Sequence, residues 1–338
     1  MPNGILLLNK PEGIRSTDCV TRVKRLFKEK TGHAGTLDST ACGLLVILLG
    51  YATRLSNYVM LLPKIYTAVV CLGAETDTAD ASGEIVMRGN ALDINEGDID
   101  LAIKSFKGEI MQVPPEISAI KIGGKAAHRI MRSIKNEKAE EGHGKQTTCV
   151  TRSREREFSL PARPVYVHEI KRTSPVSGCE FEISVRCGKG TYIRSISRDI
   201  GRMLGCGGHV RKLKRLSVGN FSADNAIDLE RLSPENLLPV ESIAAFYDRV
   251  FLNVEAETRL SNGRKVLLSE AGKFAAKPEE FINAKHVAVI GETLFGFAEI
   301  RADEADGKIP YLYPHVNIAE GKCPPEPLLK QLNGHVVV

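Results

Sequence analysis

The hydrophobic pattern of the chain mixes unbroken apolar runs, which indicate buried strands, with apolar residues spaced three or four apart, which indicate helices. Residues 44–49 form such a run, and residues 65–72 and 179–187 are rich in β-forming side chains. Another strand is predicted near the N-terminus, and Lys10 and Pro11 end it in an exposed loop. These strands are far apart in the sequence, so helices and loops must connect them.

Helical spacing between and after these strands predicts four helices. One helix is predicted to begin at Ser16, with Ser16 as its N-cap, and a second covers residues 53–62. Asp98 is predicted to cap a short third helix. A fourth helix begins beyond Gly190, which places Arg194 in its first turn. The mixture of strands and helices indicates an α+β protein.

Two further strands carry distinctive side chains. Residues 163–171 alternate, so the pattern predicts Val165, Val167 and Glu169 on one side and Tyr166, His168 and Ile170 on the other. Residues 209–217 form the densest basic stretch, with Arg211, Lys212, Lys214 and Arg215 around Leu213. As a strand it would show positive charge on both faces, which suits contact with nucleic acid, although a solvated surface would explain it equally well.

Changes in composition divide the chain. Large apolar residues almost vanish between positions 132 and 160, so this insertion is expected to be mobile and not to fold alone. Residues 233–239 resemble a linker, and a second, β-rich unit begins near Phe246. It contains β-like runs at residues 250–254, 286–290 and 294–300, and a small helix at 257–266. Two domains are therefore predicted.

Composition narrows the class of protein. The chain has 338 residues and a net charge of +5, which permits a polyanionic partner. Its eight cysteines include no Cys-x-x-Cys pair, and its histidines show no zinc-ligand spacing, so reduced thiols and no metal are predicted. No apolar run is long enough to span a membrane and no signal peptide is recognised, so a cytoplasmic protein is expected.

The glycine-rich segment 31–50 contains one carboxylate, Asp38, just before the apolar run. Small residues let the backbone approach a ligand closely, and a loop held on a rigid strand can present a reactive group. A turn-forming role is the alternative for such an aspartate. Arg194 opposes the helix dipole at its position, which predicts a carboxylate or phosphate partner for it.

Four separated stretches carry a family resemblance. They are residues 32–38, Tyr66 with 76–80, residues 114–121, and residues 189–194 with 213–215. In this order and spacing the chain resembles the TruB family of pseudouridine synthases, and its last unit resembles a PUA-like RNA-binding domain. The resemblance implies a catalytic domain at 1–245, with a mobile thumb at about 124–163, and a PUA-like domain at 246–338. It also implies a large mixed, mainly antiparallel sheet flanked by helices and loops.

The family's activity is the isomerisation of uridine to pseudouridine in the T-loop of tRNA, without cofactor or metal. By resemblance, Asp38 is the nucleophile, Tyr66 stacks on the target base and Arg194 pairs with Asp38. His33 resembles the residue that braces flipped bases, and Asp80 one near the ribose. The remaining pocket positions implied by the family are Lys10, Pro11, Tyr192 and Leu213.

The resemblance leaves two alternatives to a stand-alone tRNA enzyme. One is the guide-RNA-dependent subunit of box H/ACA particles, which is expected to lack a long thumb. The other is a tRNA-binding folding chaperone, against which the presence of Asp38, Tyr66 and Arg194 argues. The predicted partner is the T-arm of tRNA, with no membrane and no obligate protein partner.

Overall fold

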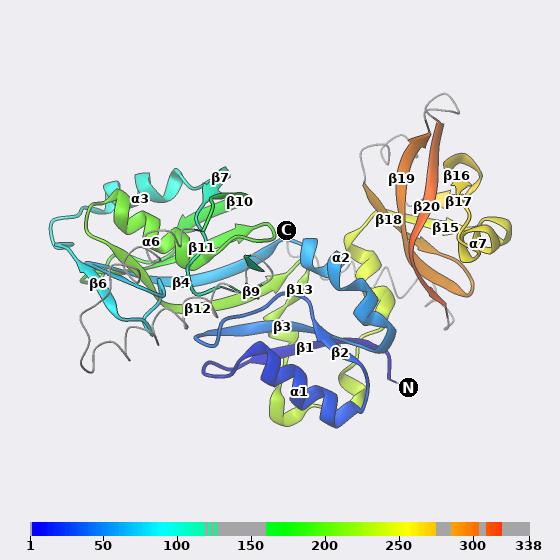
Figure 1. Cartoon of the computed structure of the whole chain (residues 1–338), viewed down its shortest axis with the longest axis horizontal. Coiled ribbons are helices and arrows are strands. Elements are labelled where there is room, and N and C mark those ends of the chain that lie inside the picture. The colour runs from blue at the N-terminus through cyan, green and yellow to red at the C-terminus, as the bar shows by residue number, and fades with distance from the viewer. Residues whose placement is uncertain are drawn as a thin grey trace.

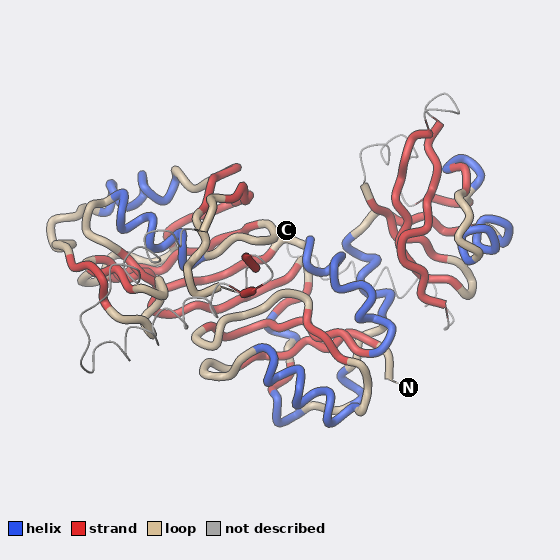
Figure 2. Tube along the Cα trace, in the orientation of Figure 1, coloured by secondary structure: helices blue, strands red, loops and turns tan. Residues whose placement is uncertain are grey.

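The structure is a computed structural model that describes residues 2–118, 121–122, 125–126, 160–274, 285–303 and 309–319. Within these ranges the chain forms two lobes, each built on its own β-sheet, and the smaller lobe holds the C-terminal strands (Figure 1). Helices cover parts of the larger sheet, whereas strands dominate the smaller lobe (Figure 2). The α+β class predicted from the sequence is confirmed.

The larger sheet has ten strands in the order β14-β1-β3-β12-β4-β11-β10-β7, with β2 also paired to β3 and β13 to β12. The β1–β14 and β3–β12 pairs are parallel and the other pairs are antiparallel, so the sheet is mixed and mainly antiparallel, as predicted. Its strands are β1 (Gly4–Lys10), β2 (Thr31–His33), β3 (Ala41–Leu49), β4 (Lys64–Leu72), β7 (Gly108–Gln112), β10 (Arg163–Arg172), β11 (Glu180–Cys187), β12 (Gly208–Val218), β13 (Phe221–Ser222) and β14 (Ile227–Asp228).

Helices bury apolar faces against this sheet. Helix α1 (Ser16–Phe27) shares a core with β1 and β3, while α3 (Glu96–Lys104) and α6 (Ile193–Met203) pack over β4, β10 and β11. The predicted helix at 53–62 is a 3₁₀ turn, Gly50–Leu55, followed by α2 (Ser56–Leu61). Two small hairpins complete the lobe, namely β5 (Ala74–Thr76) with β6 (Ile85–Arg88), and β8 (Lys121–Ile122) with β9 (Lys125–Ala126).

Two predicted helix caps are wrong. The N-cap of α1 is Arg15, because Ser16 lies inside the helix and its hydroxyl hydrogen-bonds the backbone of Leu37. The N-cap of α3 is Asn95, whose side chain accepts from the Asp98 N–H at 2.9 Å. In α1 a tertiary contact with Leu37 takes the Ser16 hydroxyl, and in α3 the side chain of Asn95 caps the helix three residues before Asp98.

The predicted faces of β10 and the predicted exposure of Lys10 also differ from the structure. A bulge between Val167 and Glu169 shifts the alternation, so Ile170 is buried on the same side as Val167. Lys10 is buried at the end of β1, where its Nζ donates to the carbonyls of Pro11 and Ile14 at 2.9 and 2.7 Å. Two carbonyl acceptors make this burial possible.

The smaller lobe is a six-stranded sheet in the order β16-β20-β19-β18-β15-β17, with α7 (Val254–Ser261) packed against it. Its strands are β15 (Arg249–Leu252), β16 (Val266–Leu267), β17 (Gly272–Phe274), β18 (His286–Ile290), β19 (Leu294–Asp303) and β20 (Ile309–Ala319). The helix begins and ends a few residues earlier than the predicted 257–266. The domain boundary at 245–246 stays a prediction.

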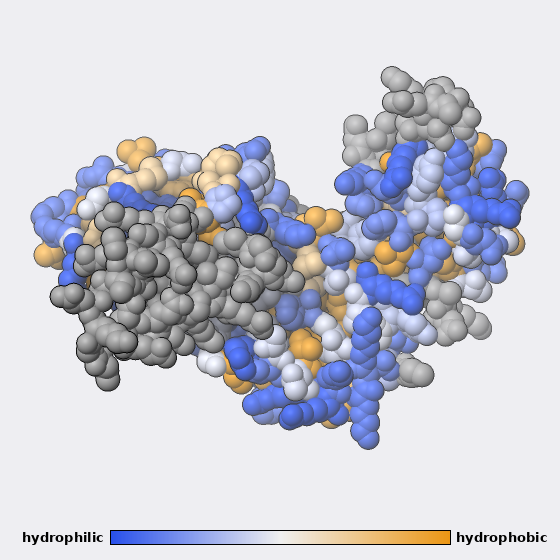
Figure 3. All heavy atoms as spheres, in the orientation of Figure 1, coloured by the Kyte–Doolittle hydropathy of each residue, from blue (hydrophilic) through white to orange (hydrophobic). Residues whose placement is uncertain are grey.

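The two lobes meet at helix α2. The Tyr58 ring on this helix stacks on Phe297 of β19, with centroids 3.9 Å apart, and both side chains are buried. In the space-filling view, hydrophobic side chains gather in the notch between the lobes, while hydrophilic ones cover the lower surface over α1 (Figure 3). The predicted thumb at about 124–163 lies outside the described residues except for 125–126 and 160–163.

Candidate active site

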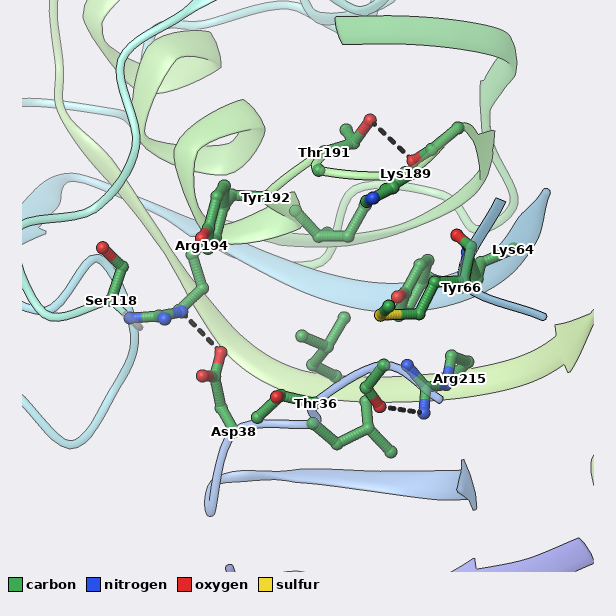
Figure 4. Close-up of a pocket in the computed structure, with 17 residues that line it drawn as sticks. Thr36, Asp38, Lys64, Tyr66, Ser118, Lys189, Thr191, Tyr192, Arg194 and Arg215 are labelled. Carbon is green, nitrogen blue, oxygen red and sulfur yellow. Dashed lines mark hydrogen bonds and ion pairs between the residues drawn. The ribbon is translucent and has the colours of Figure 1, made fainter. Parts of the chain in front are cut away.

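A cavity of about 320 Å³ lies between the loop after β2, the start of β4, the loop before α6, and β12. It brings together six residues singled out from the sequence (Figure 4). These are Asp38, Tyr66, Tyr192, Arg194, Leu213 and Arg215. The segments are far apart in the chain, so the fold creates this site.

The loop that carries Asp38 is fixed from two sides. Ser16 donates its hydroxyl to the Leu37 carbonyl at 2.7 Å and accepts the Leu37 N–H at 2.9 Å. On the other side, the guanidinium of Arg215 donates to the carbonyl of Gly35 at 3.1 Å. Gly35 has a φ of 109°, a conformation that favours glycine. Asp38 is therefore held at the cavity with its side chain 40% exposed.

Arg194 occupies the first turn of α6, as predicted, and its side chain is only 4% exposed. Its Nε lies 2.8 Å from Asp38 Oδ2. Its terminal nitrogens donate to the carbonyl of Thr78 at 2.8 Å and to that of Ile117 at 3.2 Å. The carboxylate partner predicted from its position in the helix is thus present, and the two carbonyls fix the direction of the guanidinium.

Asp80 is a second carboxylate near Arg194, with 3.9 Å between Oδ2 of Asp80 and Nη1 of Arg194. It is buried in its turn and accepts hydrogen bonds from Thr78 Oγ1 at 2.8 Å, the Ser82 N–H at 3.0 Å and Thr40 Oγ1 at 3.2 Å. A second cavity, of about 190 Å³, is lined by both Asp80 and Arg194. Arg194 therefore lies near two carboxylates and borders both cavities.

Two tyrosines line the main cavity. Tyr66 on β4 is half-buried between β11 and β12, and burial raises the pKa of its hydroxyl above the ordinary value. Tyr192 precedes α6, and its backbone is held by Gln112, which accepts its N–H at 2.8 Å and donates to its carbonyl at 3.1 Å. Burial also raises the pKa of Tyr192. Both hydroxyls are therefore neutral at physiological pH.

The predicted basic strand divides into a surface side and a cavity side. Lys212 and Lys214 are exposed, and Arg211 is exposed and pairs with Glu180 at 2.8 Å. Arg215 is not part of this surface, because it is only 1% exposed and donates through Nε to the Leu44 carbonyl at 2.7 Å. Successive strand residues face opposite sides, so Leu213 and Arg215 point to the cavity.

Several predicted site residues do not line the main cavity. His33 on β2 has a buried Nδ1 without a hydrogen-bond partner, and burial together with the Arg215 charge lowers its pKa. Lys10 is buried away from the cavity, Pro11 is exposed beside it, and Lys212 and Lys214 lie on the outer surface. Any contact they make with a ligand would occur outside the pocket.

Sequence reasoning missed Lys64, the first residue of β4, which lines the cavity beside Tyr66 (Figure 4). A charged residue between Pro63 and a β-rich run was the available signal. Across the described ranges, no group of three or more histidine, cysteine, aspartate or glutamate side chains is arranged to hold a metal ion. No helix there is long and apolar enough to cross a membrane.

Two family models match the chain. The model of the TruB family pseudouridylate synthase N-terminal domain matches residues 24–148, and that of the tRNA pseudouridylate synthase B C-terminal domain matches residues 194–257. The tRNA pseudouridine synthase B of Arthrobacter sp. (strain FB24) is 37% identical over 287 residues, which cover 82% of this chain and 86% of that protein. The chain belongs to the TruB family of pseudouridine synthases.

Other relatives agree with this assignment. The tRNA pseudouridine synthase B of Chromohalobacter salexigens is 37% identical over 80% of this chain and 83% of that protein. The solved chain from a Cbf5-Nop10-Gar1 complex superposes with a TM-score of 0.65 and 23% identity, covering 94% of this chain and 84% of that chain. This TruB family member therefore has the pseudouridine synthase fold, and it belongs to a family of isomerase enzymes.

Proposed function

We propose that this protein isomerises uridine to pseudouridine in tRNA, with Asp38 as the reacting carboxylate. The observation that carries the proposal is the ion pair between Asp38 and the buried Arg194 at the opening of a cavity lined by Tyr66. We take tRNA as the substrate from the names of the relatives, tRNA pseudouridine synthase B. Within the fold, residues 1–245 would carry catalysis and residues 246–338 would bind RNA.

The reaction exchanges one bond to the ribose for another. The C1′–N1 bond of uridine breaks, the base turns within the site, and a C1′–C5 bond forms. A carboxylate can attack the electron-poor sugar or ring carbon as a nucleophile. Asp38 suits this role because Arg194 holds one of its oxygens while its side chain remains partly open to the cavity.

The target base must leave its stack before it reaches the cavity. Extruding a base costs unstacking energy, which an aromatic side chain in the pocket can repay by about 1–3 kcal/mol. Tyr66 is the aromatic residue we assign to this role, because it lines the cavity beside Lys64 (Figure 4). We assign the T-loop as the target and place Asp80 near the ribose.

We assign the RNA contacts outside the cavity to exposed residues, chiefly Lys212 and Lys214. Lys212 and Lys214 present unburied positive charge on β12, and we propose that they contact backbone phosphates of the T-arm. We propose that half-buried His33 and exposed Pro11 contact the RNA, whereas buried Lys10 holds the carbonyls of Pro11 and Ile14. No guide RNA is required in this proposal.

The purified chain incubated with a tRNA transcript that contains tritium at C5 of uridine tests this function. Isomerisation replaces the C5 proton, so tritium release without any guide RNA is the expected result. Absence of release under conditions in which the transcript binds would contradict a stand-alone enzyme. Release that appears only when a guide RNA is added would favour the guide-dependent alternative.

A further inference from the structure

Two positive side chains lie buried at one end of the candidate active site. Lys64 is 6% exposed and Arg215 is 1% exposed, and both line the cavity. Figure 4 shows them beside Tyr66, at the end opposite Asp38 and Arg194. The ion pair of Asp38 and Arg194 therefore lies at one end of the cavity, and two further cations lie at the other.

Backbone carbonyls hold both side chains. Lys64 Nζ donates to the carbonyl of Leu62 at 2.6 Å and also to that of Met60. Arg215 donates through Nε to the Leu44 carbonyl at 2.7 Å and through Nη2 to the Gly35 carbonyl at 3.1 Å. These contacts fix the two groups without neutralising their charge, because a carbonyl carries only a partial negative charge.

Neither cation forms an ion pair with a carboxylate in the part of the chain that the structure describes. The titratable groups that face Lys64 are Arg215 from β12, Lys189 from the loop after β11, and Cys187 from β11. Burial raises the pKa of Cys187 to about 11, so this thiol is neutral at physiological pH. Burial and the Arg215 charge lower the pKa of Lys64 to about 8, which shows that its positive charge is poorly compensated.

A buried charge without a counter-ion is costly, and such groups concentrate at functional sites where a ligand supplies the opposite charge. We propose that Lys64 and Arg215 stabilise the negative charge that develops on the uracil ring when its C1′–N1 bond breaks. The proposal rests on the function proposed above. It adds an electrostatic role for the end of the cavity that Lys64 and Arg215 line.

The charges balance through the reaction. The electron pair of the C1′–N1 bond leaves with N1, so the detached uracil is an anion whose charge is shared with its carbonyl oxygens. C1′ becomes electron-poor at the Asp38 end. Ring electrons then form the C1′–C5 bond, C5 loses its proton to solvent, and N1 gains a proton from solvent. Donors fixed before the reaction stabilise such a developing charge without reorganising.

Two substitutions of Lys64 separate the effect of its charge from that of its hydrogen bonds. Lys64→Gln keeps two N–H donors for the Leu62 and Met60 carbonyls but removes the charge, whereas Lys64→Arg keeps a charge. The control is Lys104→Gln, which removes an exposed lysine from α3, distant from both cavities. The measurements are the single-turnover rate at saturating tRNA transcript from neutral to alkaline pH, the transcript Kd, its salt dependence and the melting temperature.

We expect Lys64→Gln to turn over about 100-fold more slowly, with unchanged Kd and salt dependence. Lys64→Arg should recover much of the lost rate. The native rate should fall as pH rises through about 8, because Lys64 loses its charge there. Lys64→Arg should keep its rate to higher pH, because guanidinium does not titrate in that range.

Three results would overturn the proposal. The first is a Lys64→Gln variant with the native turnover rate and pH dependence. The second is a Lys64→Arg rate as low as that of Lys64→Gln. The third is a larger Kd with a smaller salt slope in Lys64→Gln, which would indicate that Lys64 contacts a phosphate. If Lys64→Gln does not fold, a native rate that stays flat through pH 8 overturns it alone. An inactive native enzyme would instead refute the proposed function, whereas an active one with an unaffected Lys64→Gln refutes only this inference.

Discussion

Asp38 Oδ2 lies 2.8 Å from Arg194 Nε, although Asp38 comes from the loop after β2 and Arg194 from the first turn of α6. The contact is electrostatic, since Nε makes no hydrogen bond of normal geometry. Arg194 is buried and fixed by two carbonyls, while Asp38 reaches into the cavity. The buried Arg194 therefore sets the position of the Asp38 carboxylate.

This relationship predicts that Arg194→Lys turns over more slowly by about 100-fold or more. A lysine cannot contact Asp38 and the carbonyls of Thr78 and Ile117 together, because it lacks the planar fork of the guanidinium. Single-turnover kinetics with a tRNA transcript, together with the transcript Kd, measure the effect. A native rate in Arg194→Lys would show that only a nearby charge is needed.

The Ser16 hydroxyl supports the Asp38 loop through two hydrogen bonds to Leu37. Ser16→Ala should lower stability by about 1–3 kcal/mol, because it leaves buried backbone groups unpaired. It should also slow turnover by loosening the loop. The matched control is Thr21→Ala in the same helix, which removes an exposed hydroxyl that donates a hydrogen bond to the Thr17 carbonyl. Equal effects of the two variants, by denaturant unfolding and kinetics, would argue against this role for Ser16.

The exposed lysines of β12 should affect binding through charge. Replacing both Lys212 and Lys214 by alanine should weaken tRNA binding and reduce the slope of log K against log salt by about 2, if each lysine neutralises one phosphate. Arg211→Ala should have a smaller effect, since Arg211 already pairs with Glu180. Titrations at several salt concentrations measure the slope. An unchanged slope in the double variant would assign these lysines to solvated surface.

The contact between the lobes depends on Phe297. Phe297→Ala should cost about 3–5 kcal/mol, because the ring is fully buried and stacks on Tyr58. Phe297→Leu retains apolar volume and should lose less. Calorimetric or denaturant unfolding of the full chain measures both variants. Equal stability of the alanine variant and the native chain would show that this contact does not hold the lobes together.

Much of the fold follows from the sequence because strands and helices leave strong periodic signals. The apolar run at 44–49 is the core of β3, and the residues beyond Gly190 form α6 with Arg194 in its first turn. Helix caps and the β10 bulge were not predicted correctly. They depend on contacts between distant parts of the chain, such as those of Ser16 with Leu37 and of β10 with β11, which residue type alone does not determine.

The site was only partly predictable for a similar reason. Asp38 and Arg194 stood out by their positions in the sequence and Tyr66 through the family resemblance, and the structure places all three at one cavity. Arg215 was misplaced on the surface and Lys64 was missed, because a charged residue in a strand usually indicates exposure. Their burial depends on the carbonyls of Gly35, Leu44 and Leu62, which only the tertiary structure brings near them.

The most direct test of the proposed function is to map pseudouridine in a tRNA transcript after incubation with the native protein or with Asp38→Asn. The asparagine has nearly the shape of the aspartate but lacks its nucleophilic carboxylate. We expect pseudouridine at the T-loop uridine with the native protein and none with Asp38→Asn, while both bind the transcript with similar Kd. Pseudouridine formation by Asp38→Asn at the native rate would contradict the assignment of Asp38 as the reacting group.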